Sequence, residues 1–149
     1  MINKLRVRAQ SESGFTLVEL LVVMLILGLL AAIAIPAFFN QRDKAADAEA
    51  KSTARTTQTA LETYATDNNG NYTAPATGTL LDAVRKIEPT IPSSGVTVTA
   101  TAPKAYTISA VSTTGASYTF GINRSDTGVV TYPCGEPGKG GCPSDGTWD

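Results

Sequence analysis

Histidine is absent from the 149-residue chain, and only two cysteines occur, Cys134 and Cys142, both within the last 16 residues. Histidine is the commonest general base and a frequent metal ligand, so its absence removes the simplest designs for acid–base catalysis. Two cysteines without histidine also cannot complete a four-ligand zinc site of the Cys/His type. We therefore expect Cys134 and Cys142 to form a disulfide, which indicates an oxidising extracytoplasmic compartment; two free thiols in a reducing cytosol are the alternative.

Charge of either sign is scarce, with 12 Lys and Arg, 13 Asp and Glu, and a net charge of −1. Residues 1–14 hold three basic side chains and one acidic one, a net +2, so their removal leaves a body near −3. A mildly acidic body has no general attraction to nucleic acid. Gly-x-Ser-x-Gly elbows, phosphate loops and Cys/His pairs are missing too. We therefore expect no enzyme, no catalytic residue, no cofactor, no metal site and no nucleic-acid partner.

Long apolar runs are limited to one, residues 15–35, whose 21 residues include a single charge, Glu19. As a helix this run is about 31 Å long, which is enough to cross a hydrocarbon core of about 30 Å. Basic residues precede the run, and the residues just after it are balanced in charge. The positive-inside tendency therefore places the N-terminus in the cytoplasm and the remainder outside.

The order of features differs from that of an ordinary secretory signal, because the polar stretch that ends at Gly14 comes before the apolar run. Glu19 is also unusual, since an acidic residue at mid-membrane costs roughly 2.5–3.5 kcal/mol, and less near an end. Such a residue indicates a functional partner by default. The alternative is that Glu19 lies near the interface and reaches water.

The segment SGFTLVELLVVMLILGLLAAIAIPAF closely resembles the N-terminal signature of type IV prepilins and type II secretion pseudopilins, over about residues 11–45. The resemblance implies that a membrane aspartyl protease, the prepilin peptidase, cuts after Gly14 and usually methylates the new N-terminus, Phe15. Glu19 matches the family's glutamate at the fifth position of the mature chain. Cleavage yields an α-amine that is positively charged at neutral pH. In a filament this amine can meet Glu19 of a neighbouring subunit. The correct axial offset between subunits then neutralises the charge of Glu19, whereas a wrong offset leaves that charge unpaired.

Gly28 and Pro36 flank a stretch of the same helix that is poorly locked at both ends. Glycine lowers helix stability by about 1 kcal/mol and an internal proline by about 3 kcal/mol. The resemblance implies that this stretch can extend or melt during assembly. Alternatively, Gly28 and Ala32 simply allow close packing of helices in the bilayer.

Beyond Pro36 the chain stays helical in pattern. One face repeats at steps of three or four residues: Ala46, Ala50, Thr53, Thr57, Leu61 and Tyr64. The run ends at residues 67–70, Asp-Asn-Asn-Gly, which favour a left-handed helix stop. We expect one helix of about 50 residues, kinked near Pro36; two helices that meet at the proline are the alternative.

The remainder reads as a short helix and a sheet. Residues 79–87 are typical of a helix capped by Thr79, and four runs alternate like strands, at 96–101, 105–111, 117–122 and 129–132. Short loops between them, at 103–104, 114–115 and 123–128, indicate an antiparallel meander covered by the outer half of the long helix. The expected class is α+β with the pilin fold: leader 1–14, transmembrane and filament-core helix 15–36, and globular domain 37–149.

The C-terminal tail, residues 134–149, reads as a loop rich in Gly and Pro, pinned by the disulfide if that forms. Closing so short a loop contributes about 2–3 kcal/mol. By resemblance, it is a variable surface of the filament. Some pseudopilins hold calcium near this end, but the acidic residues here lack the spacing of an EF-hand and are interpreted as solvated. They are Asp126, Glu136, Asp145 and Asp149.

Three functions fit the sequence to different degrees. The favoured one is a structural subunit of a type IV pilus-like surface filament, serving adhesion, motility or DNA uptake. The second is a pseudopilin of a type II secretion system, and the third is an anchored binding domain that never polymerises. The first two imply as partners identical or related pilin subunits, the prepilin peptidase, the pilus assembly platform with its ATPase machinery, and the inner membrane. They also imply a single-pass precursor in the cytoplasmic membrane that becomes an extracytoplasmic or cell-surface filament.

Overall fold

The computed structural model describes residues 14–113 and 117–149. Residues 1–13 of the expected leader and the expected loop at 114–115 lie outside the described residues. Helix α1, Leu17–Asp67, has 51 residues and continues through Pro36 without a break in its assignment. The chain divides into two compact units, the first ending at Phe38 and the second running Phe39–Asp149. The prediction of one helix of about 50 residues is therefore confirmed.

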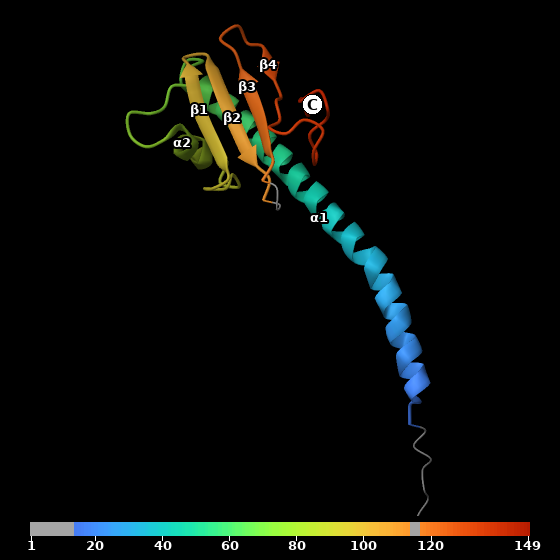
Figure 1. Ribbon diagram of the computed structural model, residues 1–149. Coiled ribbons are helices and arrows are strands. Elements are labelled where there is room, and N and C mark those ends of the chain that lie inside the picture. Colours follow the sequence, from blue (N-terminus) through green and yellow to red (C-terminus); the bar gives the residue numbers. More distant parts are fainter. Residues whose placement is uncertain (1–13, 114–116) are drawn as a thin grey trace, which may run out of the picture. The chain divides into compact units, whose positions relative to one another are not determined.

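The second unit contains the predicted antiparallel meander, in the order β1-β2-β3-β4 (Figure 1). Its strands are β1 Val96–Ala102, β2 Ala105–Val111, β3 Thr119–Arg124 and β4 Val130–Thr131. The register pairs Val98 with Ile108 and Ile108 with Ile122, so these side chains share one face of the sheet. The α+β class with a long helix on a four-stranded sheet is confirmed.

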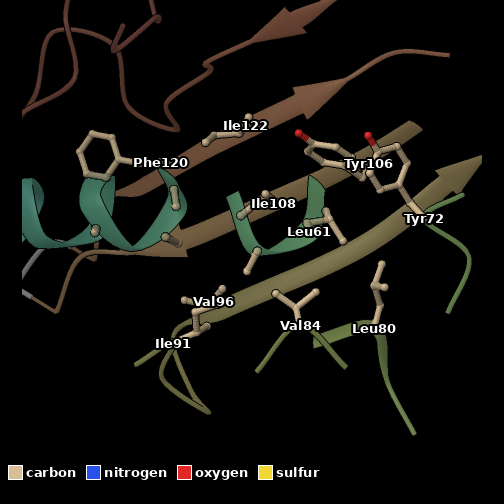
Figure 2. Packing of buried hydrophobic residues seen from close by; sticks show 14 of the residues in the cluster. Leu61, Tyr72, Leu80, Val84, Ile91, Val96, Tyr106, Ile108, Phe120 and Ile122 are labelled. Atoms are coloured by element: carbon tan, nitrogen blue, oxygen red, sulfur yellow. The ribbon is translucent and has the colours of Figure 1, made fainter. Parts of the chain in front are cut away.

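A single apolar cluster joins the sheet to both helices (Figure 2). Leu61 of α1 is fully buried near Ile108 and Tyr106 of β2 (Figure 2), and Phe120 and Ile122 of β3 belong to the same cluster. Every buried residue of α1 lies at or beyond Asp47, within the second unit. Burial of this stripe against one face of the sheet supplies the main stabilisation, at about 25 cal/mol per Å² of apolar surface.

Both predicted helix ends carry the expected chemistry. After Asp67, Asn69 and Gly70 have φ of 57° and 77°, and the Gly70 amide donates to the Ala65 carbonyl at 2.7 Å. Helix α2, Leu80–Ile87, begins at the predicted Thr79, which forms a reciprocal capping box with Asp82. The Thr79 hydrogen bonds hold the pKa of Asp82 below its usual value.

Three strands differ from their expected bounds, and β1 does so by one residue only, ending at Ala102 rather than at 101. β3 begins at Thr119 rather than 117, because Ser117 has a φ of 49° and the chain is still turning there. β4 is assigned only to Val130–Thr131, yet the pairing with β3 resumes in the same register at Phe120 and Cys134. Pro133 lies between them and has no N–H to donate, which explains the interruption.

The tail is a loop closed by the expected disulfide, and it also makes a main-chain contact that the sequence did not predict. Pro133 pairs with Thr147 as an antiparallel bridge, flanked by hydrogen bonds from Cys134 N to Gly146 O and from Trp148 N to Tyr132 O. Residues 146–148 thus run beside residues 132–134, joined to them by this one bridge and its two flanking hydrogen bonds. Trp148 is buried at the same place, and its indole N–H donates to the Gly121 carbonyl at 2.8 Å.

Candidate assembly site

The first unit exposes almost all of its apolar surface. The large hydrophobic side chains between Phe15 and Ile35 have exposed fractions between 47% and 83%. This part of α1 is long and apolar enough to cross a membrane, with a mean hydropathy of 2.9 in its most apolar window. A helix that is apolar on all sides needs lipid or other helices around it.

Glu19 has a local partner that the sequence interpretation missed. Its Oε2 atom accepts hydrogen bonds from the Thr16 amide and the Thr16 hydroxyl, each at 2.8 Å. The Glu19 amide in turn donates to the Thr16 hydroxyl at 3.2 Å. This is the capping box T-x-x-E at the start of α1, a motif readable from the sequence. Within the described part of the chain, Glu19 Oε1 has no hydrogen-bond partner.

Four further residues of the first unit were predicted to take part in processing or assembly: Gly14, Phe15, Gly28 and Pro36. Contacts among the described residues do not explain why these residue types occur there. Phe15 is 83% exposed, and Gly14 is exposed just before the helix. A Cβ added at Gly14 or Gly28 meets no atom within 4 Å. Pro36 lies inside α1 with helical residues on both sides. Packing within the described chain therefore gives no reason for a glycine at positions 14 and 28.

In the second unit, three charged side chains of α1 hold the C-terminal tail. Asp47, Lys51 and Arg55 are spaced i, i+4 and i+8 and so lie on one helix face. Asp47 Oδ2 accepts from the Gly141 amide at 2.7 Å, and Lys51 Nζ donates to the Gly141 carbonyl at 2.6 Å. Arg55 is bonded to the carboxylate of Asp149. The sequence interpretation missed this stripe, whose only signal was its spacing.

Cys134 and Cys142 form the expected disulfide, with their Cα atoms 5.8 Å apart. The loop they close is tied to α1 through Gly141. Space is tight there, since a Cβ on Gly140 would lie 2.5 Å from the Tyr118 ring and 2.8 Å from Asp47 Oδ2. The disulfide loop is thus seated on the helix by backbone contacts that need glycine.

A second polar cluster at the far part of α1 is centred on Glu62. Its carboxylate accepts from the Tyr72 hydroxyl at 2.6 Å and from the Tyr106 hydroxyl at 2.9 Å. Arg124 lies 3.9 Å from the same carboxylate and over the Tyr72 ring. Burial, together with the bond to Glu62, raises the pKa of Tyr72 to about 12, and burial raises that of Tyr106 as well. The cluster ties α1 to the segment after it and to two strands.

The acidic residues of the C-terminal region are separated and differ in surroundings. Glu136 pairs with Lys139 at 3.1 Å, Asp145 accepts from the Thr147 amide at 3.0 Å, and Asp149 pairs with Arg55. Asp126 is exposed in the β3–β4 turn. Across residues 14–113 and 117–149, no group of three or more Cys, Asp or Glu side chains is placed to hold a metal ion.

The geometry defines a class of protein: a globular helix–sheet unit that carries a fully exposed apolar helix with a carboxylate in its first turn. Comparison with known proteins gives the particular kind. The model of the prokaryotic N-terminal methylation motif matches residues 10–35. The chain therefore has a prepilin-type N-terminus.

The relatives are secretion and pilus proteins. The type II secretion system core protein G of Pseudomonas aeruginosa is 38% identical over 77 residues, 52% of each chain. The core protein G of Aeromonas hydrophila is 41% identical over 73 residues, 49% of each chain. The type IV major pilin protein PilA of Myxococcus xanthus is 43% identical over 51 residues, 34% of this chain and 23% of that one. The chain thus spans about half the length of the core proteins it matches, and no solved structure matches it significantly.

Proposed function

We propose that the chain is a structural subunit of a type IV pilus-like surface filament, with a structural rather than catalytic role. Prepilin peptidase cuts after Gly14 and methylates Phe15, and the mature chain polymerises through its N-terminal helix. One observation carries the proposal: an apolar helix without internal cover begins with a carboxylate that keeps one oxygen unused. Such a helix needs other helices or lipid, and such an oxygen needs a donor.

The chemistry of the pairing follows from the two oxygens of Glu19. Oε2 caps the helix through Thr16, so the carboxylate is held in place before any neighbour arrives. Cleavage converts the Phe15 amide into an ammonium group, which Oε1 of a neighbouring subunit can accept in an apolar, poorly screened core. Removing one partner of a buried ion pair costs about 3–5 kcal/mol. The pair therefore favours the one offset between subunits that brings the ammonium group to Glu19 of the neighbour.

The setting follows from the same segment. The precursor crosses the cytoplasmic membrane once, with its leader in the cytoplasm and the Phe39–Asp149 unit outside, as the basic leader and the disulfide favour. Residues Gly28 to Pro36 supply a weak stretch of helix that extends as subunits leave the bilayer. The partners are related or identical subunits, the peptidase, and an assembly platform with its ATPase.

A second candidate function is that of a type II secretion pseudopilin. It is favoured by the core protein G relatives, which match longer stretches of the chain than the pilin does. Deletion of the gene separates the two. Loss of long surface fibres with normal export supports the pilus, whereas failed export of folded proteins with unchanged fibres supports the pseudopilus.

The decisive experiment compares three single variants of the full chain in the producing cell. Glu19→Gln keeps an acceptor for Thr16 but removes the charge, and we expect filament yield to fall at least tenfold because the neighbour's ammonium group is left unpaired. Thr16→Ala removes the hydroxyl of the cap but keeps the charge, and should assemble nearly normally. Gly14→Leu should accumulate in the membrane with its leader attached.

Immunoblotting for leader removal, mass spectrometry of the N-terminus and electron microscopy of sheared filaments give the readouts. Normal filaments from Glu19→Gln would exclude the charge pairing. Normal processing of Gly14→Leu would exclude the cleavage site.

A further inference from the structure

The sheet is unevenly covered, and the weak point is the outermost strand, β1. The core-facing residues of β2 and β3, such as Ile108 and Ile122, are fully buried. On β1 only Val96 is buried, while Val98, Ala100 and Ala102 are half-exposed although they lie on the same face. The apolar layer therefore stops short at this edge.

The two edges of the sheet also differ in what pairs with them. At the other edge, residues 146–148 of the tail pair with residues 132–134, which follow β4, and so cover that part of the edge. Among the described residues, β1 pairs with β2 alone, and its sequence VTVTATA has neither a charge nor a proline. Natural proteins usually blunt a free edge with charge, proline or a cover. On β1 the device is a register shift between Ala100 and Ala102, which favours docking of side chains at this end over pairing with a further strand.

A groove lies along this edge, with the end of β1 as one wall. It is lined by Val98, Ala100, Ala102 and Pro103 on one side and by residues such as Thr73 and Leu80 on the other. Its volume is about 620 Å³. That lies within the range of about 300–1,000 Å³ that is usual for ligand pockets, so the groove admits a turn of chain rather than one side chain.

The opposite edge presents an apolar projection. Val129, in the turn between β3 and β4, is 61% exposed, the largest value among the large hydrophobic residues described in the second unit. The turn is held from within: Ser125 N donates to Val129 O and Gly128 N to Ser125 O, each at 2.9 Å. Gly128 has a φ of 86°, which suits this tight turn. The projection is thus preorganised and loses little entropy on docking.

Each of the two surfaces carries an exposed charge without a partner in the described part of the chain, and the two charges are of opposite sign. Lys104 follows Pro103 at the end of the groove, and Asp126 lies three residues before Val129. Both are exposed, and neither has a hydrogen bond or ion pair to any described residue. In an antiparallel meander the β1–β2 and β3–β4 turns lie at the same end of the sheet, here on opposite edges (Figure 1).

The groove beside β1 and the β3–β4 turn are different surfaces on opposite edges, and this determines the symmetry of a contact between copies of the chain. A contact between unlike surfaces of identical chains is head-to-tail, so it repeats from copy to copy and makes an open helical array or a ring. Placing one copy beside another with parallel sheets brings the β3–β4 turn of one to the groove of the next. Lys104 then comes near the neighbour's Asp126 at the rim.

We propose that the groove beside β1 is a lateral docking site for the β3–β4 turn of a second copy of this chain. Val129 fills the apolar groove, and Lys104 pairs with Asp126 of the adjacent copy. The inference rests on the proposed filament function and adds a second contact to it, between globular units rather than between apolar helices.

A charge swap in the full chain tests the proposal. Lys104→Glu and Asp126→Lys each bring like charges together, and we expect each to lower filament yield about tenfold. The double variant restores the pair with its sign reversed, so the yield should return to near that of the unmodified chain. Val129→Ser should lower the yield without rescue by either charge change. Lys86→Glu, an equal change of charge on α2 away from the groove, is the matched control and should assemble normally.

Cross-linking gives a direct readout of proximity. Lys104→Cys with Asp126→Cys should yield a ladder of covalently joined subunits on oxidation, whereas Lys86→Cys with Asp126→Cys should not. Single variants that assemble normally, a double variant that is not rescued, or a missing ladder would overturn the proposal. If the unmodified chain forms no filament, the proposed function fails instead, and the two failures are thereby distinguished. Fluorescence of the single tryptophan, Trp148, checks that each variant is folded.

Discussion

The two halves of helix α1 belong to one secondary-structure element but differ in how their side chains are used. From Leu17 to Ile35 the residues are apolar and exposed, and the main polar contact is the capping box between Thr16 and Glu19. From Asp47 to Ala65 one face is buried, and charged residues reach the tail and the strands. The second half is explained by contacts within the chain, and the first half is not. In the proposed filament, the exposed apolar surface therefore marks the half that acts between molecules.

The comparison predicts that substitutions in the second half destabilise the fold, while those in the first half affect assembly alone. The largest effect on folding is expected where the tail packs on the second half of α1, at Trp148. It packs edge-on against Phe120 and Tyr132 and lies beneath Lys51 and Arg55. Trp148→Ala should lower the free energy of unfolding by about 3–5 kcal/mol, measured by circular dichroism in urea. Trp148→Phe keeps most of the packing and should cost about 1 kcal/mol through the lost bond to Gly121. Equal effects from both variants would contradict this account.

A smaller effect is expected when Cys134 and Cys142 are both replaced by serine. The disulfide closes a loop with a sequence separation of 8, for which chain entropy gives about 2–3 kcal/mol. The tail should nevertheless stay docked, because Asp47, Lys51 and the pairing of residues 146–148 hold it independently. Trp148 fluorescence in the folded state should therefore be almost unchanged while the urea midpoint falls. A red-shifted, solvent-exposed tryptophan would show that the disulfide alone holds the tail.

Much of this architecture could be predicted from residue patterns. The single apolar run, Asn69 and Gly70 after the helix, and Thr79 three residues before Asp82 each rest on local chemistry that the structure repeats. The tail could not be predicted in this way. Its pairing with residues 132–134 depends on contacts with β3 and α1, and Gly and Pro give no strand signal. The role of Asp47 was hidden as well, because a buried charge is seen only when its partner, the Gly141 amide, is placed.

The Glu62 cluster predicts a loss of stability at high pH. The pKa of Tyr72 lies near 10 in the unfolded chain and at about 12 in the fold, so the folded state favours the neutral hydroxyl. The stabilisation is complete below pH 10 and is lost as the pH rises toward 12. At pH 11 the loss from Tyr72 alone is about 1.4 kcal/mol. Urea unfolding at pH 8 and pH 11 measures it, and Tyr72→Phe should reduce the difference by about that amount. An unchanged difference in Tyr72→Phe would assign the titration to other groups, such as Tyr106.

The smallest effect on folding is expected in the first half of α1, and it is the sharpest test of the comparison. Leu25 is 72% exposed and, like its neighbours, lies outside the buried core of the second unit. Leu25→Ala should change the free energy of unfolding of the Phe39–Asp149 unit by less than about 0.5 kcal/mol, since no packing is lost there. The measurement follows Trp148 fluorescence of the detergent-solubilised full chain in urea.

The same substitution, Leu25→Ala, should lower filament yield, because in a packed core of helices it leaves a cavity, and Leu→Ala at buried sites costs about 2–5 kcal/mol. Leu61→Ala in the second half is the matched control, with the opposite pattern of a large loss of folding stability. If Leu25→Ala destabilised the globular unit as Leu61→Ala does, the two halves of α1 would share one core, and the division of labour along the helix would have to be abandoned.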